Sequence, residues 1–146
     1  MTTIDRNGLE VLGTAECLRL LESAAVGRIG ITSGALPVIL PINYRVDGAR
    51  ILFRTGVGTK LDAATRNAVV AFEVDHIDPV YHSGWSVVVT GVATDVDGAS
   101  DDAVWATPRW THGAEDRLVA ISIDEISGRR LDGAGPQGSW DLHDSA

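Results

Sequence analysis

The sequence predicts a mainly β fold, a six-stranded antiparallel barrel with two or three short helices. Turn signals built from Gly, Asp and Pro recur about every ten residues, and strand-like runs lie between them. Short strands at this spacing favour an antiparallel barrel over a parallel sheet. The 146 residues fit one domain, and a hydrophobic content of 45% is enough to bury a core without disulfides.

The chain divides into an N-terminal arm (1–13), a barrel domain (14–131) and a Gly-rich C-terminal tail (132–146). A short helix is expected from Thr14, as its cap, to about residue 25. Leu18, Leu21 and Ala25 would share the buried face of that helix.

Six segments after this helix have the pattern of strands. They are 26–32, 36–46, 50–54, 69–74, 85–96 and 118–126. Asp47-Gly48 predicts a hairpin between the second and third, because both residues tolerate a positive φ. Residues 75–83 are expected to be a polar loop, and 100–116 a mixed region with one helix.

The second strand is apolar on both faces and contains Pro37 and Pro41. Proline cannot donate a hydrogen bond to a neighbouring strand, so part of this segment should lie at a sheet edge. We expect one face to be covered by the core and the other by a partner or a ligand.

Composition and motifs exclude several classes of function. A net charge of −8 argues against a general nucleic-acid binder, and no apolar run approaches the ~20 residues that span a bilayer. Cys17 is the only cysteine and no apolar signal core begins the chain, so we expect a cytoplasmic protein. No Walker loop, nucleophile elbow or zinc motif is present, so a bound cofactor would have to carry any chemistry.

Lys60, the only lysine, lies in the most suggestive segment. Arg54 and Thr55 end a strand, two glycines follow, and Thr59 and Lys60 open a short helix with Asp62 at capping-box spacing. Such a turn suits a phosphate, because a helix start offers free N–H groups and glycine lets the backbone come close. The same residues are also compatible with a capped surface helix bearing solvated charges.

A family resemblance is carried by a series of segments in order. They are Gly27-Arg28-Ile29-Gly30, Pro37 to Tyr44, Leu52-Phe53-Arg54-Thr55, Gly58-Thr59-Lys60-Leu61, Ala71 to Asp75 and Trp85 to Gly91. Together they resemble the pyridoxamine 5′-phosphate oxidase-related flavin-binding split barrels, in particular the branch with 5-nitroimidazole reductases. The resemblance covers roughly residues 14–131.

The resemblance implies roles for nine residues in cofactor binding. Pro41, Ile42 and Asn43 would run beside the flavin ring; Arg54, Thr55, Thr59 and Lys60 would hold ribityl and phosphate; Trp85 and Ser86 would approach the flavin, from either subunit of a homodimer. Thr59 stands where the branch often has a second basic residue. Arg54 and Lys60 would therefore share the phosphate.

The function implied is that of an FMN-binding oxidoreductase that passes hydride or electrons to a small organic or nitroaromatic acceptor. A reductase using a deazaflavin cofactor and a non-enzymatic carrier of a flavin or other planar ligand are the alternatives. Trp105 and Trp110 would form a lid or a substrate wall, or would serve in packing. Trp140, in the Gly-rich tail, would fold back over the site or belong to a disordered end.

Overall fold

The computed structural model describes residues 2–96 and 116–132. These residues form ten strands and two helices, which confirms the mainly β class. The elements are β1 (Thr3–Ile4), β2 (Glu10–Val11), α1 (Thr14–Ser23), β3 (Val26–Ser33), β4 (Leu36–Asn43), β5 (Arg45–Asp47), β6 (Arg50–Gly56), α2 (Lys60–Ala64), β7 (Ala68–Asp78), β8 (Ser83–Asp95), β9 (Asp116–Ser122) and β10 (Glu125–Leu131).

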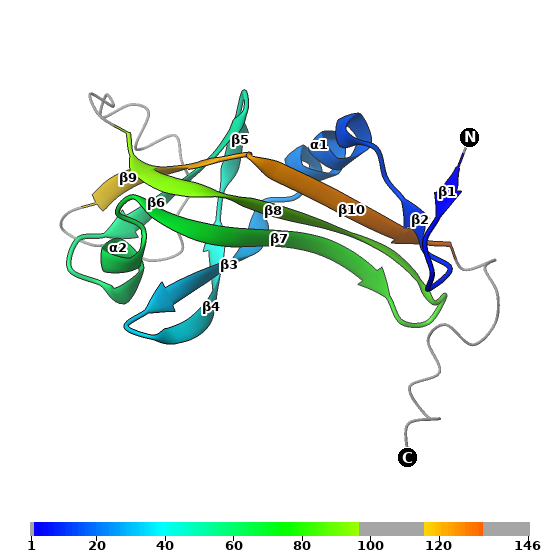
Figure 1. Cartoon of the computed structure of the whole chain (residues 1–146), viewed down its shortest axis with the longest axis horizontal. Helices are drawn as coiled ribbons and strands as arrows, with labels where there is room; N and C mark the ends of the chain where they lie inside the picture. The colour runs from blue at the N-terminus through cyan, green and yellow to red at the C-terminus, as the bar shows by residue number, and fades with distance from the viewer. Residues whose placement is uncertain (1, 97–115, 133–146) are drawn as a thin grey trace, which may run out of the picture.

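All strand pairs are antiparallel, and β8 is the strand around which they are arranged (Figure 1). On one side β8 pairs along its length with β7, and the sheet continues through β3 to β4. On its other side the first half of β8 pairs with β10 and its last residues pair with β9. The sheet therefore divides at β8 into two branches.

The second branch bends back to make a split barrel. β9 pairs with β6, β6 pairs with β5, and β6 contacts β4 without a strand pairing between them. β4 pairs with β3 alone among the described strands, as the prolines at 37 and 41 predicted for an edge. The Asp47-Gly48 hairpin is also confirmed, with Gly48 at φ +60°.

Two predicted strands are each divided in the structure. Segment 36–46 breaks at Tyr44, where the chain leaves β3 and begins to pair with β6 as β5. Segment 118–126 breaks between Ser122 and Glu125, where it passes from β9 to β10 while remaining beside β8. With the two short strands of the arm, these divisions turn six predicted strands into ten.

The predicted loop 75–83 was wrong. β7 continues to Asp78 and β8 begins at Ser83, so the turn comprises only residues 79–82. Both polar and apolar residues of this stretch are exposed or half-buried, because it forms the end of a long hairpin that extends from the barrel. The Asp78 carboxylate accepts the backbone N–H groups of Val80 and Tyr81 at 3.0 and 3.2 Å, which closes the turn.

The N-cap of helix α1 lies one residue earlier than predicted. Gly13, not Thr14, is the N-cap, and no side chain caps the helix. The buried residues are Cys17, Leu20 and Leu21. Leu21 was predicted correctly, whereas Leu18 is only half-buried and Ala25, beyond the end of the helix at Ser23, is exposed.

The main core lies inside the barrel. Its largest fully buried side chains include Phe53, Phe72, Leu21, Ile29 and Ile51. A second cluster packs α1 against β8 and β10. No helix among residues 2–96 and 116–132 is long and apolar enough to cross a membrane. The predicted mixed region 100–116 falls almost entirely, and Trp105, Trp110 and Trp140 fall wholly, outside the described residues.

Candidate functional site

The turn between β6 and α2 is closed by Thr59, which caps the helix as predicted. The Thr59 hydroxyl accepts the Asp62 N–H at 3.1 Å and donates to the carbonyl of Gly56 at 2.9 Å. It also lies 3.2 Å from the Thr55 hydroxyl. The Asp62 carboxylate accepts the N–H of Gly58 at 2.8 Å, whereas a standard capping box would use the N–H of Thr59.

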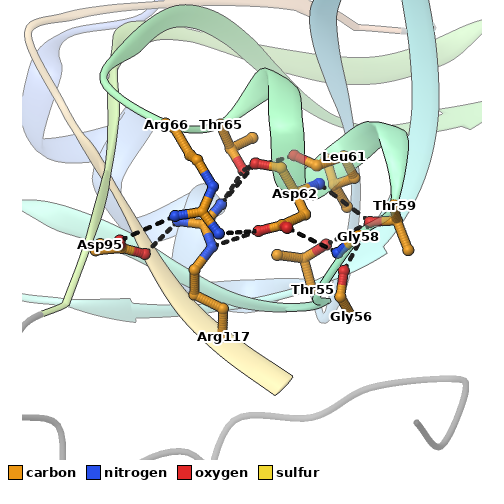
Figure 2. A network of polar contacts seen from close by, with 10 residues as sticks. All are labelled: Thr55, Gly56, Gly58, Thr59, Leu61, Asp62, Thr65, Arg66, Asp95 and Arg117. Atoms are coloured by element: carbon orange, nitrogen blue, oxygen red, sulfur yellow. Dashed lines mark hydrogen bonds and ion pairs between the residues drawn. The ribbon is translucent and has the colours of Figure 1, made fainter. Parts of the chain in front are cut away.

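Asp62 belongs to a buried polar network that ties α2 to β8 and β9 (Figure 2). Arg117 Nε donates to Asp62 Oδ1 at 2.6 Å, and Arg117 Nη2 donates to the Asp62 carbonyl at 2.9 Å and to Thr65 Oγ1 at 2.7 Å. Arg117 also pairs with Asp95, and Arg66 with both carboxylates. The Asp62 carboxylate accepts hydrogen bonds from the backbone N–H of Gly58 and from the guanidiniums of Arg117 and Arg66. These bonds hold the pKa of Asp62 below its usual range.

Lys60 is the first residue of α2 and is exposed. Within the two described ranges, no hydrogen bond or ion pair engages its ammonium group. The charged side chains of the neighbouring network, in contrast, form ion pairs with one another. They are Asp62, Arg66, Asp95 and Arg117. Lys60 is therefore an exposed cation at this end of the barrel whose ammonium is not engaged by the described residues.

Arg54, which was expected to share a phosphate with Lys60, is bonded to Asp116 in this structure. Its Nε donates to Asp116 Oδ2 at 3.1 Å and its Nη2 also bonds this oxygen, and the two side chains are only 6% and 10% exposed. Successive strand residues face opposite ways, so Thr55 turns toward α2 while Arg54 turns to the other side of β6. Asp116 is 62 residues away in sequence, and no local pattern pointed to it.

The predicted ring-binding segment lies on the edge strand β4. Ile42 is buried in the core, Asn43 is half-buried, and Pro41 is exposed. The outward side of this strand has no strand neighbour among those described. A planar group could therefore approach the β4 backbone from outside the barrel.

Trp85 and Ser86 lie at the opposite end of the long hairpin from α2 (Figure 1). Trp85 packs against the main core and against the second cluster, beside α1. Ser86, the next residue along the strand, faces outward. Asp95, which holds Arg117 beside α2, is ten residues further along β8. Most of the length of β8 therefore separates Trp85 from the α2 end of the barrel.

An exposed face runs across the sheet between these two ends, and we call it the outer sheet face. Its paired residues share one side of the sheet. They are Arg28, Gly30, Pro37, Ile39, Pro41, Val69, Ala71, Glu73 and Val88. Ile39 and Val69 are 71% and 70% exposed, and Val88 on the same face is also exposed.

A charged group lies within the outer sheet face. Arg28 Nη1 is 3.4 Å from both Glu73 Oε1 and Asp75 Oδ2. Partial burial and the neighbouring Asp75 carboxylate together raise the pKa of Glu73 to about 7, against the lowering effect of Arg28. Sequence reasoning did not single out this group, because its members come together only through the β3–β7 register.

Three hollows lined by described residues do not bring the nine predicted residues together. Trp85 and Ser86 line one of about 60 Å³, far below the ~300 Å³ at which typical ligand pockets begin. Two larger hollows, of about 410 and 540 Å³, are lined by none of the nine. Residues 2–96 and 116–132 hold no group of three or more His, Cys, Asp or Glu side chains suited to a metal ion.

Comparison with known proteins places these features in a family. The model of the pyridoxamine 5′-phosphate oxidase family matches residues 13–130. The uncharacterized protein Rv0080 of Mycobacterium tuberculosis is 39% identical over 123 residues, covering 80% of this chain and 81% of that protein.

Two solved structures show the same fold. The FAD binding protein of Mycobacterium smegmatis is 36% identical, with a TM-score of 0.68 over 84% of this chain and 98% of that one. A Bacteroides thetaiotaomicron protein named for 5-nitroimidazole antibiotic resistance has a TM-score of 0.67 over 89% of this chain and 90% of that one. At 12% identity, this second likeness concerns the fold alone.

Proposed function

Because the chain belongs to the pyridoxamine 5′-phosphate oxidase family, we propose that it binds a flavin nucleotide and acts as a flavin-dependent oxidoreductase. The observation that carries the proposal is the glycine turn with its exposed Lys60. The chain's only lysine stands at the start of α2, while the neighbouring charges are engaged with one another. An ammonium group in this setting suits a phosphate.

The family resemblance of the sequence favours FMN as the bound nucleotide, and FAD is the second candidate. FAD is favoured by one relative, the M. smegmatis protein at 36% identity, which is described as an FAD binding protein. With Arg54 bonded to Asp116, Lys60 would take the greater share of the phosphate of either nucleotide. A deazaflavin is the third candidate cofactor, and its binding is measured in the titration described below.

In this proposal the protein binds and orients, and the flavin supplies the redox chemistry when bound. The edge strand β4 would lie along the ring, with Pro41 on its exposed side and Asn43 offering a polar group at its end. Lys60 would hold the phosphate. The acceptor would be a small organic or nitroaromatic molecule, and a nicotinamide or another source would supply electrons. A cytoplasmic location, expected from the lone Cys17, is part of the same proposal.

A titration of the purified protein tests the cofactor. Riboflavin, FMN, FAD and a deazaflavin are added separately, and binding is followed by flavin fluorescence and absorbance. We expect Lys60→Ala to weaken FMN binding about tenfold or more, the value of a charged hydrogen bond, and to leave riboflavin binding nearly unchanged. Arg50→Ala, which removes an exposed cation at the other end of β6, is the control. A protein that binds none of the four ligands would refute the proposal.

Turnover separates an enzyme from a carrier. The flavin-loaded protein is mixed with a reduced nicotinamide and a nitroaromatic acceptor, and loss of nicotinamide absorbance is followed. Catalytic oxidation above that of free flavin supports the oxidoreductase. A protein that holds its flavin but shows no turnover with any reductant supplied would be a carrier.

We also propose that the protein is a homodimer joined through the outer sheet face. Trp85 lies near the start of β8, whereas the network beside Lys60 reaches Asp95 at its end, so a second copy would let both residues serve one ligand. A two-fold pairing of the face with itself would bring the Ser86 end of one chain near the α2 end of the other. The exposed apolar residues Ile39 and Val69 would be covered in the process.

The dimer is tested by a charge placed on this face. Val69→Asp is expected to yield a monomer in sedimentation and light scattering, and to lose flavin binding with it. Ile4→Asp alters an apolar residue that is 56% exposed on the arm and should leave the dimer intact. A wild-type protein that is monomeric yet binds flavin would contradict the dimer and leave the cofactor proposal standing.

A further inference from the structure

We propose that Arg117 is a positioning residue for the phosphate turn: it fixes the backbone on both sides of Lys60, and so sets the affinity for the phosphate of a flavin. This inference rests on the proposed function, because it assigns a role within the same site. Arg117 lies on β9, far from the turn in sequence, and its guanidinium reaches α2 from the side (Figure 2).

Helix α2 is too short to hold its own position. It has five residues, and isolated helices shorter than about 12 residues are marginal in water. Its place therefore depends on tertiary contacts. Leu61 and Ala64 supply an apolar contact with the barrel core, and Arg117 supplies the polar one.

One guanidinium connects both ends of this helix. Arg117 donates to the Asp62 carbonyl and to Thr65 Oγ1 at the C-terminal end. It also holds the Asp62 carboxylate, whose other oxygen accepts the N–H of Gly58 before the N-terminal end. Lys60 lies between Gly58 and Asp62, so its backbone is fixed by partners on either side.

The hydrogen bonds between Arg117 and Asp62 are costly to break because both side chains are buried. The side chains of Arg117 and Asp62 are 10% and 7% exposed, and a buried charge that loses its partner is costly. The turn is thus held in one form before a ligand arrives, and preorganisation of this kind raises affinity. The ammonium of Lys60 remains outside the network, accessible to a phosphate.

The network as a whole carries no net charge. It joins two carboxylates, Asp62 and Asp95, with two guanidiniums, Arg66 and Arg117. Its contribution to phosphate binding is therefore geometric, and charge-conserving variants can show this.

Arg117→Lys is the main test, because it keeps the charge but loses the planar fork that binds Asp62, Thr65 and Asp95 together. We expect the dissociation constant of FMN to rise about tenfold, and that of riboflavin, which lacks the phosphate, to change less than about twofold. Arg50→Lys makes the same change at the other end of β6 and should alter neither. FAD replaces FMN if it is the nucleotide that binds.

A double-mutant cycle with Lys60→Ala shows whether Arg117 acts through Lys60. In the Lys60→Ala background, Arg117→Lys should cause little further loss of FMN affinity, because the group that it positions is absent. Two fully additive losses would overturn the proposal. Equal weakening of FMN and riboflavin would also overturn it, since that pattern reports a general structural defect.

Asp95→Asn is the second variant, for the case in which Arg117→Lys does not fold. Asp95 is 41% exposed and holds the outer side of Arg117. Removal of a negative charge near a phosphate site should tighten FMN binding if charge alone matters, whereas loosening of Arg117 should weaken it about threefold. Unchanged or tighter binding overturns the proposal. Wild-type protein that binds FMN no better than riboflavin would refute the Lys60 phosphate seat and this inference together.

Discussion

Glu73→Gln should make the protein more stable at pH 8 and leave its stability near pH 4.5 unchanged. Glu73 lies on the outer sheet face between Arg28 and Val88, with Asp75 on the same side of the strand. Burial and the Asp75 charge raise the pKa of Glu73 to about 7 from the usual 4.5. The folded chain therefore keeps a proton that the unfolded chain releases between these values.

The sign and size follow from proton linkage. Below pH 4.5 Glu73 is protonated in both the folded and the unfolded chain, and its favourable contribution to stability is fully present. As the pH rises toward 7, Glu73 loses its proton in the unfolded chain alone, and the free energy of unfolding falls. A rise from 4.5 to about 7 corresponds to at most about 3.4 kcal/mol. Because the side chain is 34% exposed, solvent screening reduces the expected effect to about 1–2 kcal/mol.

Urea unfolding of wild type and variant at pH 4.5 and pH 8 measures this difference directly. Other carboxylates titrate in both proteins, so their effects cancel in the comparison. Glu22→Gln, on the exposed side of α1, is the matched control and should change stability little at either pH. A Glu73→Gln protein no more stable than wild type at pH 8 would refute the reasoning.

Three further changes concern the scaffold. Tyr44→Phe removes the buried hydroxyl that donates to an α1 carbonyl and should lower the free energy of unfolding by about 1–2 kcal/mol in urea titrations. Gly91→Ala should cost more than about 3 kcal/mol or abolish cooperative thermal unfolding, because a Cβ there would overlap the carbonyl of Ser122; Gly13→Ala, with open space around it, should be mild by the same calorimetric measurement. Thr59→Ala removes the cap of α2 and should cost about 1 kcal/mol in urea unfolding, and an unchanged midpoint would argue against the bonds assigned to its hydroxyl.

The parts of the fold that sequence predicted are those set by local chemistry. The Asp47-Gly48 hairpin, the cap at Thr59 and the edge position of the Pro37 strand each depend on residues close together in the chain. The strand divisions at Tyr44 and after Ser122 escaped prediction. They occur where a strand-like segment changes its pairing partner, and partner choice is a tertiary property.

The candidate site was predictable to a similar extent. The turn that carries Lys60 was recognised from its spacing. Its supports were not, because Arg117 and Asp95 reach α2 only through the pairing of β8 with β9. The bond of Arg54 to Asp116 likewise depends on the β6–β9 register, and no local pattern indicated it.

The position of β8 between the two branches of the sheet also bears on how the chain is synthesised. Its partners β9 and β10 are formed by residues 116–131, near the C-terminal end. Until those residues leave the ribosome, the long β7–β8 hairpin has an open edge, and open edges are templates for misassembly. Nascent chains that stop before residue 116 should therefore be recruited to chaperones or aggregates, and release of the last strands would be the step that ends this vulnerability.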